Sequence, residues 1–329
     1  LRRSIIIKAS MLVSIFLLLT ACQTPLQTRV LLADNHLGFS QHIISNVPFY
    51  PQQAFFCGPT TLSEVINFYG GTAAPEDIAP ATFIPDLEGT LQVEMTASAR
   101  QNGLLAYAER GSLTQLLGLV RDNIPVIVLQ NNSISMFPMW HYAVVIGYDL
   151  AEENIIFHTG ETKAHKLNLG TFERTWQRSN YWLLAAVPGS VSSQHFNKFI
   201  YTKAAQDLLS TGQTDAGLIA MQRASHEWLD YWLPYFLLAN HYLPTNPRVA
   251  AQWYQKGYQL AKAEVQTQVP YLNNYAYVLA KLGCKDKANT LIEQALALSP
   301  EAESLLDTKE QIKLSTSLET LYCQATNLN

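Results

Sequence analysis

Two side chains that could carry out nucleophilic catalysis lie far apart in the sequence, Cys57 and His141. A cysteine attacks as the thiolate, and because the pKa of a free thiol is about 8.5, the sulfur needs help to lose its proton. Cys57 precedes Gly58-Pro59 at the start of a predicted helix, whose free N–H groups and dipole stabilise an adjacent anion. His141 begins a predicted strand and can take the proton if folding brings the two groups together. The pair indicates acyl transfer through a thioester.

Acyl transfer also needs hydrogen-bond donors for the developing oxyanion. The backbone N–H of Cys57 can supply one donor and a side-chain amide the other, and losing one donor typically lowers the rate about 10²–10³-fold. Gln52, five residues before Cys57, is the natural candidate for the amide, and Gln53 is the alternate. A lone cysteine is usually inert packing. Its place at a helix start, before Gly-Pro, favours a nucleophile instead.

The sequence around these residues resembles the C39-like peptidase family, a branch of the papain-like fold. VPFYPQQAFFCGPTTLSEVINFYGG at 47–71 and WHYAVVIGYD at 140–149 carry the resemblance. GTFERTW at 170–176 resembles the helix that follows the active-site strands in that family. The resemblance covers about residues 47–187 and implies a cysteine peptidase, with amide hydrolysis as the outcome.

The family pattern implies a role for each matching residue. Cys57 is the nucleophile, His141 is the base and then the acid, and Gln52 lies in the oxyanion hole. In the family an Asp on the next strand usually orients the histidine, whereas Thr159 stands at that place here. A hydroxyl can accept the imidazole Nδ1–H, but it cannot stabilise an imidazolium as a carboxylate does. His158 is the other candidate, so the third member stays open.

Hydrophobic periodicity predicts the elements that must position these residues. A helix opens after Cys57-Gly58-Pro59 and ends at Gly70-Gly71, with one apolar face made by Leu62, Val65, Ile66 and Tyr69. Further helices are expected at 91–102 and, capped by Ser112, at 112–122. Strands are expected at 125–130, 141–148, 155–158, 166–169 and 181–187, with a hairpin turn beginning at Asp149. Helices followed by a mostly antiparallel sheet make an α+β domain, placed at residues 43–190.

The N-terminal residues 1–22 read as an export signal. A basic head and a short apolar run lead to Leu19-Thr20-Ala21-Cys22, which resembles the lipobox of bacterial lipoproteins. That resemblance implies cleavage before Cys22 and a lipid on its thiol; an ordinary signal peptide with a chance cysteine is the alternative. Gln23 resembles the outer-membrane class of Gram-negative lipoproteins, which places the protein on the outer membrane facing the periplasm. Residues 23–42 are expected to be a polar tether.

Residues 198–329 are expected to be all-helical. Gly212 and Gly283 lie at equivalent turns 71 residues apart, which fits two tetratricopeptide periods of about 34 residues plus a small insertion. A plain helical bundle is the alternative. Such repeats would bind a protein partner in their concave face. Cys284 and Cys323 could pair in an oxidising periplasm, but the sequence does not decide it.

Composition excludes several other classes of function. The net charge is −4 and no Lys/Arg cluster lies beyond the extreme N-terminus, so nucleic acid is not expected as a partner. There is no Cys-x-x-Cys, no His-Glu-x-x-His and no glycine-rich phosphate loop, so neither metal nor cofactor is expected.

We therefore expect an α+β papain-like cysteine peptidase domain followed by an all-α tetratricopeptide-like repeat domain, acting on a protein or peptide. The alternative is a catalytically weak C39-like domain that acts as a peptide-binding or assembly lipoprotein.

Overall fold

The computed structural model describes residues 24–33, 38, 40–52, 55–134, 136–316 and 323. The expected signal peptide, Cys22 and Gln53 lie outside these residues. The chain divides into two compact units, Leu1–Ser98 with Ala108–Ala185, and Ala99–Tyr107 with Ala186–Asn329. Within the described ranges, no helix has the length and apolar character needed to cross a membrane.

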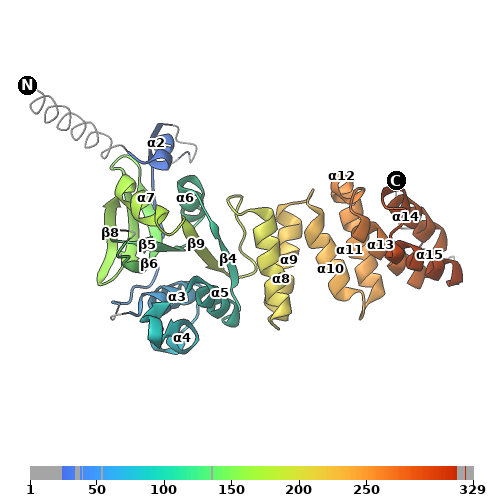
Figure 1. Ribbon diagram of the computed structural model, residues 1–329, viewed down its shortest axis with the longest axis horizontal. Coiled ribbons are helices and arrows are strands. Elements are labelled where there is room, and N and C mark those ends of the chain that lie inside the picture. Colours follow the sequence, from blue (N-terminus) through green and yellow to red (C-terminus); the bar gives the residue numbers. More distant parts are fainter. Residues whose placement is uncertain are drawn as a thin grey trace, which may run out of the picture. The chain divides into compact units, whose positions relative to one another are not determined.

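A twisted sheet is the centre of the first unit (Figure 1). In the described part of the chain it has seven strands, in the order β4-β9-β5-β6-β7-β8 with β1 added beside β6. The strands are β1 (Gln41–Ile43), β4 (Leu105–Arg110), β5 (Val126–Asn131), β6 (Trp140–Asp149), β7 (Asn154–Thr159), β8 (Thr162–Asn168) and β9 (Trp182–Val187). The neighbours from β9 to β8 pair antiparallel. The five expected strands are confirmed, whereas β1 and β4 were not predicted.

Helices pack beside this sheet and complete an α+β domain, as expected. They are α3 (Cys57–Phe68), α4 (Pro75–Thr82), α5 (Gln92–Gln101), α6 (Leu113–Arg121) and α7 (Leu169–Gln177). Between α4 and α5 the chain forms a small hairpin of β2 (Phe83–Ile84) and β3 (Gly89–Thr90), joined by a 3₁₀ turn at Pro85–Leu87. The predicted cap is confirmed, because the Ser112 side chain accepts a hydrogen bond from the Gln115 N–H at 3.2 Å.

Helix α3 is the element that carries the candidate nucleophile, and it packs against β6. Leu62 and Val65 are completely buried and Ile66 nearly so, which is the expected apolar face. Tyr69 was expected on that face but caps the C-terminus, and Gly70 follows with φ +90°. A positive φ is strained for residues with a Cβ, so the glycine ends the helix there.

The expected tether is wrong in its first part, because a helix already lies on the domain there. Helix α2 (Leu26–Ala33) lies beside α6 and α7 (Figure 1). The buried carboxylate of Glu173 in α7 accepts hydrogen bonds from the N–H groups of Gln27 and Thr28 at 3.1 and 2.6 Å, and from the Thr28 hydroxyl at 2.7 Å. A negative group at a helix N-terminus satisfies its free donors. Because this cap comes from a residue far along the chain, local periodicity cannot reveal it.

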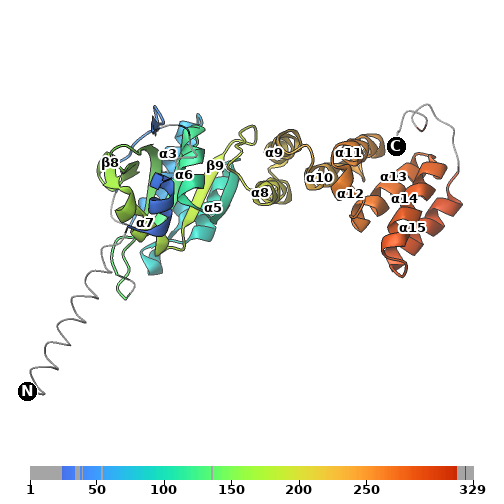
Figure 2. The same ribbon diagram turned by 90° about the horizontal axis from the view of Figure 1, so that it is seen from above.

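The second unit is all-helical beyond β9, as expected (Figures 1 and 2). Its helices are α8 (Lys198–Ser210), α9 (Thr214–Glu227), α10 (Trp232–Tyr242), α11 (Pro247–Leu260), α12 (Lys262–Val265), α13 (Val269–Lys281), α14 (Lys285–Leu298) and α15 (Glu303–Leu314). They pack as pairs, α8 with α9, α10 with α11 and α13 with α14. The first helices of the pairs begin 34 and 37 residues apart, at Lys198, Trp232 and Val269. The short α12 lies in the longer interval.

Equivalent turns join the two helices of the first pair, α8 and α9, and of the last pair, α13 and α14. Gly212 and Gly283 have φ +84° and +81°, so both turns use the left-handed conformation that glycine adopts without strain. Between the pairs, the core is rich in tyrosine: Tyr235, Tyr254 and Tyr271 are completely buried. The Tyr271 hydroxyl donates to the Tyr254 carbonyl at 2.6 Å, which satisfies its polar end.

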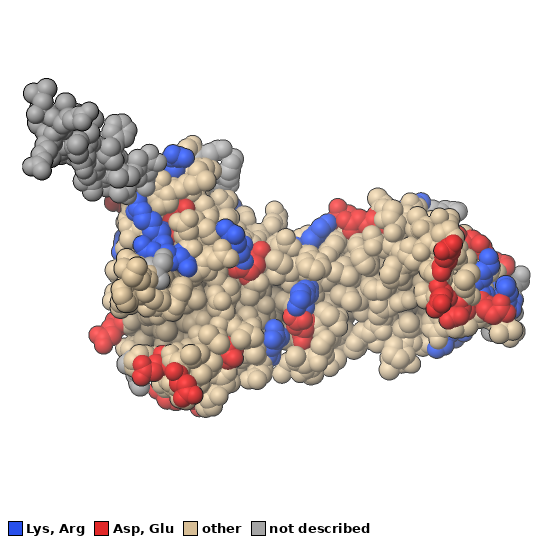
Figure 3. Space-filling view, in the orientation of Figure 1, with Lys and Arg blue, Asp and Glu red and all other residues tan. Residues whose placement is uncertain are grey.

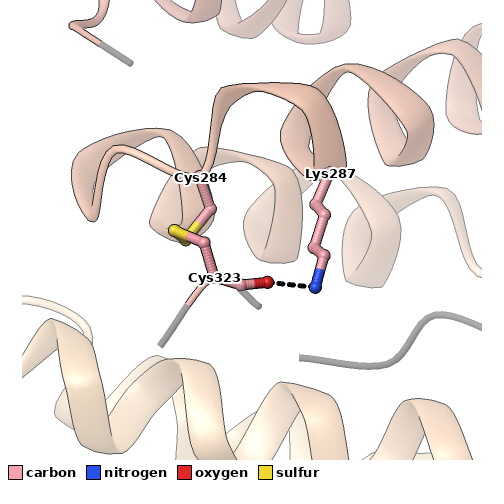
Figure 4. Close-up of a disulfide and its surroundings, with 3 residues drawn as sticks. All are labelled: Cys284, Lys287 and Cys323. Carbon is pink, nitrogen blue, oxygen red and sulfur yellow. Dashed lines mark hydrogen bonds between the residues drawn. A yellow bond between two sulfur atoms is a disulfide. The ribbon is translucent and has the colours of Figure 1, made fainter. Parts of the chain in front are cut away.

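The two cysteines of the second unit form a disulfide, which settles what the sequence left open (Figure 4). Cys284 precedes α14 as its N-cap, and the bond ties Cys323 to it. The Lys287 ammonium donates to the Cys323 carbonyl. A closed loop of 39 residues stabilises chiefly by restricting the unfolded chain.

Charged side chains are sparse on the face drawn in Figure 3, where basic and acidic groups lie among much uncharged surface.

Candidate active site

A cavity of about 1210 Å³ in the first unit brings together three of the predicted site residues. Cys57, His141 and Gln52 all line its wall. They come from the start of α3, from β6 and from the segment that precedes α3, so the sheet and the helix position them jointly. The lining therefore joins a thiol, an imidazole and a side-chain amide.

Cys57 is the first residue of α3, as predicted. The N-cap residue Phe56 makes no side-chain cap hydrogen bond, so it does not compete for the N–H groups of the first turn. Gly58 is required by close packing, because a Cβ there would lie 2.5 Å from the Thr90 hydroxyl of β3. The Tyr142 hydroxyl donates to the Thr90 carbonyl at 3.2 Å. Strands β3 and β6 thus enclose the helix start.

This enclosure changes the expected acidity of the thiol. Burial raises the pKa of Cys57 above its ordinary value, and hydrogen bonds from the backbone N–H groups of Tyr142, Gly58 and Cys57 itself lower it only in part. The sequence predicted a thiolate stabilised at a helix start. Burial opposes that stabilisation, because the desolvation cost of the anion exceeds the effect of the backbone donors.

His141 lies on β6, opposite Gln130 of β5. Its Nε2 is 2.8 Å from the Thr159 hydroxyl, so the residue at the family's Asp position does face the imidazole. The expected atom was wrong: the contact uses Nε2 rather than Nδ1. Burial lowers the pKa of His141, and a hydroxyl offers no negative charge to oppose that shift.

His158 is wrong as the alternative third member. It is buried, and its Nε2 is 3.3 Å from the Val47 carbonyl, to which it donates. Its Nδ1 accepts a hydrogen bond from the Ala164 N–H at 3.1 Å. Both ring nitrogens are therefore engaged elsewhere. Successive side chains of a strand point to opposite faces, so Thr159 and its neighbour cannot both face His141.

The backbone of Gln52 is held next to Thr159, the residue that contacts His141. The Gln52 backbone N–H donates to the Gly160 carbonyl at 3.0 Å, and Gly160 directly follows Thr159. Gly160 has φ +54°, a conformation that favours glycine. One turn between β7 and β8 thus fixes both the imidazole and the amide-bearing residue. The side-chain Oε1 of Gln52 is buried without a hydrogen-bond partner among the described residues.

Glu64 is a residue near the site that the sequence analysis missed. It lies on α3 seven residues after Cys57 and is completely buried. Its Oε1 accepts a hydrogen bond from the Tyr50 N–H at 3.0 Å, and burial raises its pKa to about 8. Glu64 lies on the face of α3 opposite to the predicted apolar face, so the hydrophobic periodicity gave no signal that it would be buried.

The mouth of the cavity carries exposed apolar side chains. They are Phe55, Leu87, Leu91, Met139 and Trp140. Arg178 lies on the same wall and donates to the Asn131 carbonyl at 3.0 Å. Over the described ranges, no cluster of three or more His, Cys, Asp or Glu side chains could hold a metal ion.

The match to a protein-family model agrees with the motifs. Residues 44–182 match the model of the Peptidase_C39 like family. A candidate C39-like peptidase from Bacillus anthracis is similar at 17% identity, covering 47% of this chain and 100% of that chain with a TM-score of 0.41. The peptidase domain of Streptococcus ComA, a bi-functional ABC transporter involved in a quorum sensing pathway, is similar at 19% identity, covering 44% and 99% with a TM-score of 0.37. The search of curated proteins found no match. Over residues 44–182 the chain is therefore similar to the C39-like peptidase family.

Proposed function

We propose that the first domain is a cysteine peptidase that hydrolyses peptide bonds through an acyl-enzyme on Cys57. The observation that carries the proposal is the shared cavity, whose lining includes Cys57, His141 and Gln52. The match of residues 44–182 to the C39-like peptidase family supports it.

The hydrogen bond of His141 indicates how the proton moves. With Nε2–H donating to the Thr159 hydroxyl, the neutral ring has Nδ1 free to accept a proton. His141 Nδ1 takes the thiol proton as Cys57 attacks the substrate carbonyl carbon. It then gives that proton to the departing amine. Water, deprotonated by the same nitrogen, releases the acid product and restores the thiol.

The oxyanion of each tetrahedral intermediate needs two donors. In this proposal they are the Cys57 backbone N–H and the Gln52 side-chain amide. The Cys57 N–H is fixed because it lies in α3. The backbone that carries the Gln52 side chain is fixed by the hydrogen bond from the Gln52 N–H to the Gly160 carbonyl. Fixed donors stabilise developing charge without reorganisation, and each contributes about 10²–10³-fold in rate.

Peptide cleavage by the purified protein tests this function. We expect a mixture of internally quenched peptides to be cleaved by the wild type and left intact by Cys57→Ala. In cells, the envelope proteome of a Cys57→Ala strain should accumulate uncut precursors. An unchanged proteome together with absent peptide cleavage would refute a peptidase.

We also propose that the chain is an outer-membrane lipoprotein that faces the periplasm, anchored by a lipid on Cys22. Helix α2 begins at Leu26 and is fastened to the domain by Glu173. At most about 3.6 Å per residue, the lipidated residue would lie within roughly 14 Å of α2. The peptidase would then act close to the membrane surface. Incorporation of labelled palmitate that is lost in Cys22→Ser would support the anchor, whereas label retained in that variant would refute it.

The second unit would bind a protein partner as a set of tetratricopeptide-like repeats. Helix pairs that begin 34 and 37 residues apart support this proposal, because the repeat period is about 34 residues. A partner captured by the full chain and lost on deletion of residues 198–329 would support it. Capture that persists in the deletion variant would contradict it.

The surroundings of the catalytic pair favour a second function, a catalytically weak domain that binds peptides. Thr159 gives the imidazole no charged partner, and the pKa shifts of Cys57 and His141 both oppose a thiolate–imidazolium pair. A binding module would hold peptides equally well in the wild type and in Cys57→Ala, with no turnover in either protein.

A further inference from the structure

The segment that carries Gln52 runs along α3 and is attached to it at a distance from Cys57. Glu64 lies seven positions after Cys57 in the helix, a spacing of nearly two full turns and about 10.5 Å of rise. The two side chains therefore project from the same side of α3. Tyr50 is bound beside Glu64, and two residues later Gln52 lines the cavity beside Cys57.

Two side chains of α3 make that attachment. The Glu64 carboxyl accepts the Tyr50 N–H at 3.0 Å, and the Asn67 Nδ2 donates to the Tyr50 hydroxyl at 2.8 Å. Asn67 Nδ2 also donates to the Ala73 carbonyl at 2.9 Å, which limits its own movement. The Tyr50 side chain and backbone are thus both bonded to one helix.

Glu64 is an unusual choice for a buried position. It is completely buried, its second oxygen has no hydrogen-bond partner in the described part of the chain, and no ion pair there includes it. A buried carboxyl group with one unsatisfied oxygen destabilises a fold relative to an apolar side chain of similar size. Such a residue needs a role other than packing, and its one hydrogen bond holds the Gln52 segment.

We propose that Glu64 is a positioning residue, which fixes Tyr50 and thereby holds the Gln52 amide where the oxyanion forms. This inference rests on the proposed function. Burial keeps the carboxyl protonated at neutral pH, since its pKa is about 8. It therefore acts as a neutral acceptor, and a glutamine can replace it.

Two reactions of the Cys57 sulfur distinguish loss of oxyanion stabilisation from a general disruption of the active site. Acetylation of Cys57 by p-nitrophenyl acetate passes through an oxyanion, whereas alkylation by iodoacetamide forms none. We expect Glu64→Leu, which keeps the volume but removes the acceptor, to slow acetylation about 10²-fold and to leave the alkylation rate within about twofold. Glu64→Gln should retain wild-type rates for both reactions.

A double-variant cycle tests whether Glu64 acts through Gln52. If it does, Gln52→Ala combined with Glu64→Leu acetylates no more slowly than Gln52→Ala alone, because the shared effect is already lost. Effects that multiply, or equal losses in acetylation and alkylation, overturn the proposal. Glu173→Leu is the matched control, since it removes another buried acceptor of backbone N–H groups that lies outside the cavity. It should leave both rates unchanged.

Tyr50→Phe provides the milder variant in case Glu64→Leu fails to fold. It removes only the hydroxyl that Asn67 binds, and we expect acetylation to slow several-fold at an unchanged alkylation rate. No change in acetylation would count against the proposal. If Gln52→Ala itself leaves acetylation unchanged, the oxyanion role of Gln52 fails too. That result differs from one in which Gln52→Ala slows the reaction and Glu64→Leu does not.

Discussion

Replacing Glu64 by glutamine should stabilise the first domain increasingly as the pH rises. Burial raises the pKa of Glu64 from 4.5 to about 8 in the folded state. Below pH 4.5 the carboxyl is protonated in both folded and unfolded chains, so the two proteins should be about equally stable. Above that pH the unfolded wild type loses the proton while the folded state keeps it, so folding must take the proton up again.

The size of this effect follows from the interval between the two pKa values. Each pKa unit corresponds to about 1.36 kcal/mol. Between pH 4.5 and pH 7 the wild type should therefore lose about 3 kcal/mol relative to Glu64→Gln, and the difference should level off above the folded pKa of about 8. Comparing the two proteins at each pH cancels the contributions of all other titrating groups.

Hydrogen exchange measured by mass spectrometry on peptides from α3 gives the free energy of unfolding of this domain alone. The difference between the two proteins should be near zero at pH 4.5 and should grow by about 1.4 kcal/mol per pH unit up to pH 7. A difference that is constant with pH would show that Glu64 does not carry the raised pKa. The account of a neutral acceptor beside Tyr50 would then be wrong.

Four further predictions concern the site. Thr159→Asp should raise the pKa of His141 and increase acetylation of Cys57 about tenfold, because a carboxylate stabilises the imidazolium; a slower reaction would argue against the Nε2 contact. Gly160→Ala should lower the free energy of unfolding by about 1 kcal/mol and slow acetylation of Cys57, because φ is +54° there. Urea unfolding and the acetylation rate measure the two effects, and a variant unchanged in both would contradict the prediction. Alkylation of Cys57 in the protein without substrate should follow a thiol pKa above its ordinary value, so an alkylation midpoint well below that value contradicts the enclosed thiol. Reduction of the Cys284–Cys323 bond should lower the unfolding free energy of the second unit by about 4 kcal/mol, and an unchanged melting curve would oppose this.

Local signals in the sequence were sufficient to predict the parts of the site that depend on local structure. Gly58-Pro59 and the apolar period after it predicted a helix that opens just after these residues, and α3 begins slightly earlier, at Cys57. The apolar, β-branched run at 141–148 predicted a strand, and β6 contains it. The Thr at the family's Asp position does lie beside the imidazole. In each case a short-range pattern decides the outcome.

The missed elements depend on contacts between distant residues. Helix α2 is capped by Glu173, more than a hundred residues away, so the residues that satisfy its first N–H groups cannot be found from its own sequence. Strand β4 (Leu105–Arg110) contains two alanines, which are weak strand formers. It is placed by pairing with β9 rather than by propensity.

The electrostatics of the site could not be predicted for a related reason. A helix start lowers a thiol pKa, whereas burial away from water raises it. Around Cys57 the packing of β3 and β6 removes water, so burial outweighs the backbone donors. Which ring nitrogen of His141 meets Thr159 depends in the same way on how β6 and β7 pair, and that pairing shifts register between Val145 and Gly147.

The most direct test of the central claim is to trap the acyl-enzyme and map it. After reaction with p-nitrophenyl acetate, mass spectrometry of peptides from the wild type should place the acetyl group on Cys57. His141→Ala should acquire it at least about 10²-fold more slowly. Acetylation at another residue, or an equal rate on Cys57 without the imidazole, would contradict a nucleophile at the start of α3 that is activated by His141.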